Sequence, residues 1–290
     1  MSLLAELVLV FVAGLLTALA TGLGALPYFV VDEVGDRWNV ALWGLASGIM
    51  VSASLFGLVG EGLAYGTAWD LVPGLLAGVV LVLVADAVLE RADVGHGHGH
   101  GDDAGHDHDE EGDLATTQAA ALRERNWRKL VLVLGILTVH SFPEGVAVGV
   151  SFAELGFEGG VDVLGFSVPL LAVFMTVAIS IHNVPEGLAI SIPLKELGMR
   201  RRWMVGAAVF SSLPQPVGAV IAYAFVTWAR AFIPFGFGFA AGAMVFLVLT
   251  EFIPEALETG ADLPGKGYAE VVAGVVAGFV LMVPLAFVGP

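Results

Sequence analysis

The 290-residue chain contains no cysteine, few charged residues and very few basic ones. Without cysteine it can form neither disulfide bonds nor thiolate metal sites, so its redox compartment cannot be inferred. Charged residues make up 14% of the chain, whereas soluble domains carry about 25%. The 12 Lys and Arg residues leave a net charge of −16. This charge argues against a nucleic-acid partner, because phosphate binding needs a basic surface.

Signatures of catalysis and energy coupling are absent as well. The chain has no complete Gly-x-x-x-x-Gly-Lys-(Ser or Thr) loop for ATP and no Asp-Lys-Thr-Gly phosphorylation sequence. It also lacks the His-Glu-x-x-His pattern of zinc proteases, in which the general base lies between two metal-binding histidines. We therefore expect a protein that is not an enzyme and uses no organic cofactor.

What the chain has in excess is apolar sequence. Hydrophobic residues make up 57% of it, and the mean hydropathy is +0.87. A helix needs about 20 apolar residues to cross the hydrocarbon core of a bilayer. The sequence therefore predicts an all-α, polytopic membrane protein, a bundle of eight transmembrane helices in a single domain, residues 1–290. The predicted segments are approximately 3–31, 40–65, 71–91, 128–152, 163–194, 203–229, 232–255 and 267–289. The fifth is overlong, and we expect its last turns, around Pro193 and Lys195, to leave the membrane.

The basic residues are distributed unevenly between the two sides of this bundle. The odd-numbered connections between segments hold eleven of the 12 Lys and Arg residues, and only Arg230 lies on the opposite side. Cytoplasmic loops of membrane proteins carry an excess of Lys and Arg. We therefore expect a multi-pass protein of the plasma membrane with the odd connections in the cytoplasm and both termini outside the cell.

The third connection, roughly 92–127, is the only long one, and it is rich in histidine. Set among Gly and Asp, this stretch can bury little apolar surface, so we expect it to be disordered. Histidines beside carboxylates bind zinc, which favours a cytoplasmic loop that captures or senses metal. A solvated linker without a metal role is the alternative. The histidines are His96, His98, His100, His106 and His108.

The two remaining histidines begin two copies of one motif, His-x-x-Pro-Glu-Gly, in the fourth and fifth segments. Each His precedes its Glu by four residues, so the two side chains share one helical face. An ionisable group at bilayer depth costs ~2.5–3.5 kcal/mol on insertion scales and is seldom kept without a use. The glycine after each Glu allows a neighbouring helix to approach closely. Two imidazoles and two carboxylates suit Zn²⁺ or another divalent transition metal. The predicted intramembrane metal ligands are His140, Glu144, His182 and Glu186.

These motifs resemble those of the ZIP (Zrt/Irt-like) family of divalent metal transporters, and the similarity extends over the whole chain. The resemblance implies eight helices and import of Zn²⁺, or else Fe²⁺, Mn²⁺ or Cd²⁺, into the cytoplasm through a site on helices four and five. It also implies a second metal ion, bridged by the same two glutamates. Here the chain departs from the family pattern, because Ser141 replaces Asn and Gln215 stands where many relatives have Glu, although Asn183 is kept. We expect the second site to be weak or absent.

Three further residues are weaker candidates for the metal pathway. Met50 could contact metal through its thioether, although a methionine at this position more often fills the core. Asp86 lies toward the end of the third segment, and Glu251 could be an entrance or exit ligand or a helix-end charge. The sequence leaves three alternatives open for the function: a metal exporter, a metal-gated channel and a membrane-embedded zinc hydrolase. It also leaves open whether the protein is a homodimer.

Overall fold

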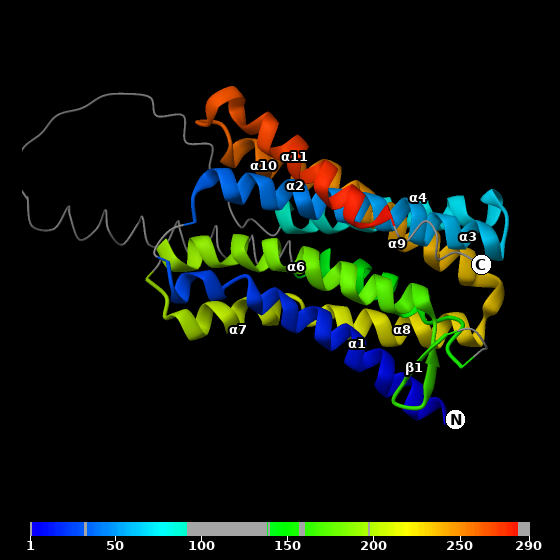
Figure 1. Cartoon of the computed structure of the whole chain (residues 1–290). Helices are drawn as coiled ribbons and strands as arrows, with labels where there is room; N and C mark the ends of the chain where they lie inside the picture. Colours follow the sequence, from blue (N-terminus) through cyan, green and yellow to red (C-terminus); the bar gives the residue numbers. More distant parts are fainter. Residues whose placement is uncertain are drawn as a thin grey trace, which may run out of the picture.

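The computed structural model describes residues 2–31, 34–91, 138, 140–156, 160–196 and 198–283, and these residues are almost entirely helical (Figure 1). The first half contains α1 (Leu3–Leu23), η1 (Leu26–Phe29), α2 (Asp36–Ser52), η2 (Ala53–Val59), α3 (Gly60–Tyr65) and α4 (Ala68–Arg91). A helical segment at 140–151 and a hairpin of β1 (Val161–Val163) and β2 (Phe166–Val168) follow. The remaining elements are α6 (Leu170–Glu196), α7 (Arg201–Ser211), α8 (Pro214–Trp228), η3 (Arg230–Phe232), α9 (Ile233–Leu247), η4 (Val248–Phe252), α10 (Ile253–Thr259), η5 (Pro264–Gly267) and α11 (Tyr268–Leu281).

Six helical spans within the described residues are long and apolar enough to cross a membrane. They are Leu3–Leu23, Asp36–Tyr65, Ala68–Val88, Leu170–Ile192, Arg201–Trp228 and Arg230–Thr259. The expected multi-pass helical membrane protein is therefore confirmed. Of the other two predicted segments, the fourth is described only in part and the eighth contains the shorter helix α11. The total of eight transmembrane helices stays a prediction, and the histidine-rich connection lies outside the described residues.

The helices form two bundles that lie side by side (Figure 1). One bundle contains α2, α3, α4, α9, α10 and α11, and the other contains α1, α6, α7 and α8. The helical segment 140–151 packs closely against α8, so it belongs to the second bundle. The two bundles contact each other mainly where α2 meets α6. We call them the α2 bundle and the α6 bundle.

The two ends of the molecule differ in charge. The start of α1 and the end of α11 lie at one end, which we call the outer end (Figure 1). The turns before α2, between α6 and α7, and before α11 lie at the opposite, inner end, together with Arg37, Lys195 and Lys266. The two termini of the described chain therefore lie on the same side of the bundle.

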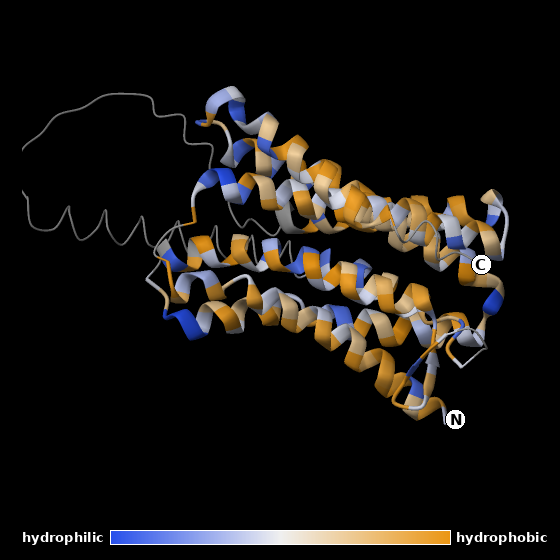
Figure 2. Ribbon diagram, viewed as in Figure 1, coloured by the Kyte–Doolittle hydropathy of each residue, from blue (hydrophilic) through white to orange (hydrophobic). Residues whose placement is uncertain are grey.

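Apolar residues cover the outer surfaces of both bundles, and α6 carries polar residues midway along its length (Figure 2). Gln215 is a buried polar residue at the start of α8. Exposed tryptophans stand at both ends, Trp38 and Trp203 at the inner end and Trp69 and Trp228 at the outer end. Tryptophan is enriched at membrane–water interfaces. Both pairs therefore lie where tryptophan is typically found in a membrane-spanning helical protein.

Two predicted segments differ in detail from the structure. The prediction that the fifth segment is helical from residue 163 was wrong, because residues 161–168 form the hairpin and α6 begins only at Leu170. Gly165 supplies a turn and Pro169 favours an extended residue before it, so the apolar residues between them pair as strands. The sixth segment is interrupted between α7 and α8, where Pro214 and Pro216 lack the N–H groups that a continuous helix needs.

Candidate metal centre

Three of the four predicted ligands meet in the interior of the α6 bundle. Glu144 comes from the helical segment 140–151, and His182 and Glu186 come from successive turns of α6. Their ligand atoms all lie within 4.8 Å of one another, and each residue is at most 1% exposed. The Nε2 atom of His182 lies 3.2 Å from Oε1 of Glu144. We call these three residues the deep group.

Glu186 is the residue of the deep group whose charge lacks compensation. Among the residues that the structure describes, neither of its carboxylate oxygens has a hydrogen-bond partner, and Nδ1 of His182 has none either. A buried carboxylate without a partner is costly, and a second carboxylate beside it adds repulsion. A divalent cation would supply the missing partner and neutralise both glutamates. The deep group is therefore suited to a metal ion by charge as well as by ligand type.

A chain of side-chain amides fixes the other glutamate. Gln215, at the start of α8, donates a hydrogen bond from Nε2 to Oε2 of Glu144. Asn183 donates from Nδ2 to Oε1 of Gln215 at 3.1 Å and to the carbonyl oxygen of Thr17 in α1 at 2.8 Å. Asn183 and Gln215 are both fully buried. The network holds Glu144 with one oxygen toward His182 and connects the deep group to α1.

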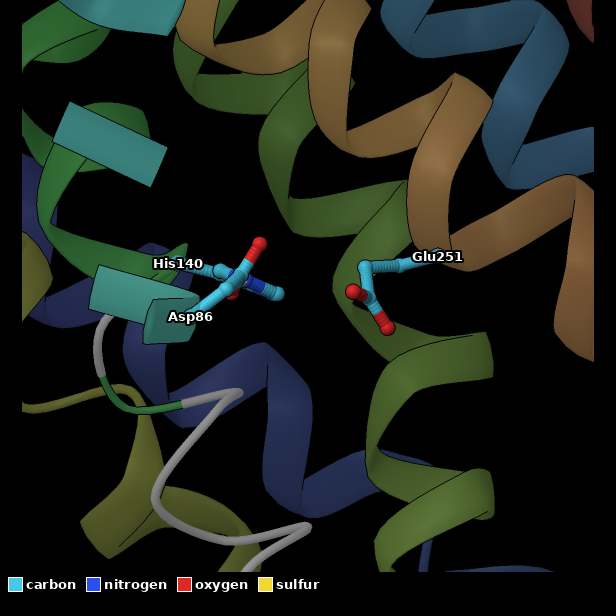
Figure 3. Close-up of side chains that lie close together, drawn as sticks. All are labelled: Asp86, His140 and Glu251. Carbon is cyan, nitrogen blue, oxygen red and sulfur yellow. Dashed lines mark ion pairs between the residues drawn. The ribbon is translucent and has the colours of Figure 1, made fainter. Parts of the chain in front are cut away.

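His140 lies apart from the other three predicted ligands, in a second group with Asp86 of α4 and Glu251 of η4 (Figure 3). The ligand atoms of these three residues also lie within 4.8 Å of one another, and Nε2 of His140 is 3.8 Å from Oδ1 of Asp86. His140 is 1% exposed, while the Asp86 side chain is 25% exposed and Glu251 is half-buried. We call this set the inner group.

The inner group differs from the deep group in its construction. His140 belongs to the α6 bundle, whereas Asp86 and Glu251 belong to the α2 bundle, so this group spans the interface between the bundles. His140 precedes Glu144 by one turn of the same helical segment, on the side of the inner end. The deep group and the inner group therefore follow one another along the helical segment 140–151, with the inner group nearer the inner end.

The glycine after each motif glutamate is a point of contact between helices. A Cβ atom on Gly145 would collide with the backbone carbonyl of Gln215, and one on Gly187 would collide with the carbonyl of Thr21. These glycines therefore let α8 and α1 approach close enough for Gln215 and Thr17 to reach the deep group. The expectation of close helix approach at these positions is confirmed.

The other sequence candidates occupy varied positions. Met50 is completely buried in the main hydrophobic cluster, and Ser141 is buried beside His140. The five loop histidines lie outside the described residues. Asp86 and Glu251 were predicted as separate candidates, and the sequence did not predict that both lie close to His140. The structure adds that Glu251 lies in the π-helical turn η4, and such turns often mark functional sites.

Comparison with known proteins shows which family the chain resembles over most of its length. A family model described as ZIP Zinc transporter matches residues 84–286. A protein of Arabidopsis thaliana is 37% identical over 242 residues, which are 83% of this chain but only 33% of that protein. Zinc transporter GufA of Myxococcus xanthus is 32% identical over 285 residues, which are 94% of this chain and 96% of GufA. Zinc transporter ZIPB of Bordetella bronchiseptica is 34% identical over 276 residues, which are 91% of this chain and 75% of ZIPB.

Proposed function

Because the chain belongs to the ZIP zinc transporter family, we propose that it carries Zn²⁺ through the membrane by way of the deep group. The observation that carries this proposal is the buried carboxylate of Glu186, which lies next to Glu144 and His182 and has no hydrogen-bond partner within the described part of the chain. One divalent ion would balance the two negative charges and bind the free oxygens. The same set of one imidazole and two carboxylates suits Zn²⁺ and Cd²⁺ best, then Fe²⁺ and Mn²⁺, and it disfavours Mg²⁺ and Ca²⁺.

The inner group supports a direction of movement. It lies one helical turn from the deep group toward the inner end, and its carboxylates are more exposed than those of the deep group. An ion leaving Glu144 would meet His140 next, then Asp86 and Glu251, and each step exchanges protein ligands for water. We infer that the deep group receives the ion from the outer end and that the inner group releases it.

The proposed orientation places the inner end in the cytoplasm. The positive charge of Arg37, Lys195 and Lys266 at this end supports that assignment. In the plasma membrane both termini would then lie outside, and the histidine-rich connection would lie on the cytoplasmic side, next to the point of release. The fourth and eighth predicted segments complete the proposed total of eight transmembrane helices.

Zinc uptake into proteoliposomes tests the proposed function directly. We expect the parent protein to accumulate Zn²⁺ along an imposed gradient, and the His140→Ala/Glu186→Ala variant to show only the leak of empty vesicles. This variant removes one ligand from the deep group and one from the inner group, so both proposed ion-binding positions are impaired. Uptake by the variant at the parent rate would contradict a pathway through these residues.

Two alternatives give different results in the same preparation. In oriented vesicles an exporter would move zinc mainly outward, whereas a metal-gated channel would pass zinc in either direction down the imposed gradient. A zinc hydrolase would show no uptake but would cleave ester, peptide or phosphate substrates in a metal-dependent manner, with Glu144 or Glu186 as general base. If the folded protein takes up no zinc and shows no metal-dependent hydrolysis, both zinc transport and the hydrolase are excluded.

The amide network favours a single ion at the deep group. Gln215 brings no charge and occupies one oxygen of Glu144, where a second ion would have to bind. We expect anomalous diffraction from zinc-soaked crystals to show one ion at Glu144, His182 and Glu186. The Gln215→Glu variant adds a third carboxylate and should bind a second ion about 3.5–4 Å from the first. Two equally occupied ions at the deep group of the parent protein would contradict this prediction.

A further inference from the structure

A short hairpin connects the two elements that carry the deep group. It lies at the outer end, between the helical segment 140–151 and α6. Its strands β1 and β2 are antiparallel, with Val161 opposite Val168 and Val163 opposite Phe166. The turn consists of two residues, Leu164 and Gly165, and β2 is followed directly by Pro169 and α6.

The turn places a leucine in an unfavourable backbone conformation. The φ angle is 54° at Leu164 and 81° at Gly165. Two-residue hairpin turns with positive φ at both positions favour Asn-Gly or Asp-Gly, because a branched apolar residue is strained there. Leu164 is also 87% exposed, so its side chain gains nothing from packing within the described protein. Strain kept without an internal contact points to a role for the side chain outside the protein.

The two faces of the hairpin show how it lies on the molecule. Val163 and Phe166 are half-buried and pack on the main hydrophobic cluster, whereas Asp162 projects from the opposite face and is exposed. Side chains alternate between the faces of a strand, so the hairpin has an apolar face against the helices and a polar face outward. Asp162 also accepts a hydrogen bond at 3.1 Å from the backbone N–H of Gly165, which braces the turn.

The position of the hairpin brings its tip to the level of the membrane surface. The strands run across the helix axes at the outer end, and the tip reaches the periphery of the α6 bundle (Figure 1). Membrane-spanning helices are tilted by about 20° from the bilayer normal on average, so strands that run across them lie roughly along the plane of the bilayer. Trp69, at the start of α4, and Trp228, at the end of α8, are 87% and 84% exposed at the same end of the molecule, and exposed tryptophans are typical of the membrane–water interface.

We propose that Leu164 inserts into the outer leaflet of the bilayer and anchors the hairpin to lipid. At the tip of the hairpin the exposed large apolar side chain is Leu164, and Val161, 43% exposed, lies at the base of the hairpin. That is too little for a stable protein partner, which covers about 800 Å² on each side. A single exposed leucine, at the same end of the molecule as two exposed tryptophans, is suited to the boundary between lipid headgroups and acyl chains. The anchor joins the metal-carrying helices to the lipid, and it does not depend on the identity of the transported ion.

The absence of cysteine makes the contact directly measurable. A nitroxide spin label attached to Leu164→Cys in a lipid nanodisc reports collisions with oxygen, which concentrates in lipid, and with a nickel chelate confined to water. Val80→Cys on the lipid-facing side of α4 and Asp262→Cys in the inner turn serve as lipid and water references. Asp162→Cys, on the polar face of the same hairpin, is the matched control.

We expect the label at position 164 to collide more with oxygen than with the nickel chelate, as at position 80, and the label at 162 to behave like that at 262. Nickel access at 164 equal to that at 162 would show a tip in water and would overturn the proposal. Low access to both reagents would show a protein contact, such as a second copy of the chain, and would overturn it equally. Val161→Cys provides a second label whose oxygen access should fall between those of 164 and 162.

Discussion

The Glu186→Gln variant should lose roughly 100-fold or more of the zinc uptake of the parent protein. The substitution keeps the shape of the side chain but removes the charge that has no partner in the interior. Replacing residues that only orient metal ligands already costs about 10–100-fold in metal affinity, so the loss of a ligand should cost at least as much. Initial rates of uptake across a zinc concentration series give the measurement.

Metal-free stability distinguishes a ligand from a structural residue in the same variant. Burying two neighbouring carboxylates without a cation is unfavourable, so the neutral amide should leave the thermal midpoint of the metal-free protein equal to or above that of the parent. Added zinc should then stabilise the variant less than the parent, because binding stabilises only the folded state. Glu258→Gln, an exposed substitution on α10, is the control and should change neither property. A lower metal-free midpoint together with parent-like uptake would show that Glu186 has a structural role only.

The Gly187→Val variant should abolish uptake through packing. A Cβ at this position already collides with the carbonyl of Thr21, so valine must push α1 away from α6. That displacement separates Asn183 from the carbonyl of Thr17 and strains the hydrogen bond between Thr21 and Ser212. Overpacking of a tight interface typically costs about 1–3 kcal/mol. Thermal midpoint, monodispersity and zinc uptake are the measurements.

Gly206→Val on α7 is the matched control for this substitution. It makes the same chemical change within a helix, but no heavy atom lies within 4 Å of the added Cβ. The control should retain uptake and change stability only by the small helix-propensity difference between the two residues, which favours valine over glycine. Equal behaviour of the two variants would mean that the contact between α1 and α6 does not support the deep group. Gly187→Ala should show the same defect as Gly187→Val to a smaller degree.

The sequence alone determined the features that depend on local spacing. The four-residue interval between His and Glu in each motif required only the helical period, so the pairing of His182 with Glu186 on α6 could be predicted. The long apolar segments likewise required only the thickness of the bilayer, and six of them appear among the described residues as helical spans long and apolar enough to cross a membrane. The departures at Ser141 and Gln215 were also visible without a structure, because they are changes of residue type.

The tertiary structure decided which helices face each other. His140 and Glu144 have the spacing of a pair, yet His140 meets Asp86 and Glu251, while Glu144 meets His182 and Glu186. His140 faces the α2 bundle, whereas Glu144 faces α6 within its own bundle. The packing of helices far apart in sequence determines which carboxylates approach each of these two residues. The same packing brings the carbonyl of Thr17 to Asn183 and the amide of Gln215 to Glu144. The helical period places side chains on a face, but only the arrangement of helices decides what that face contacts.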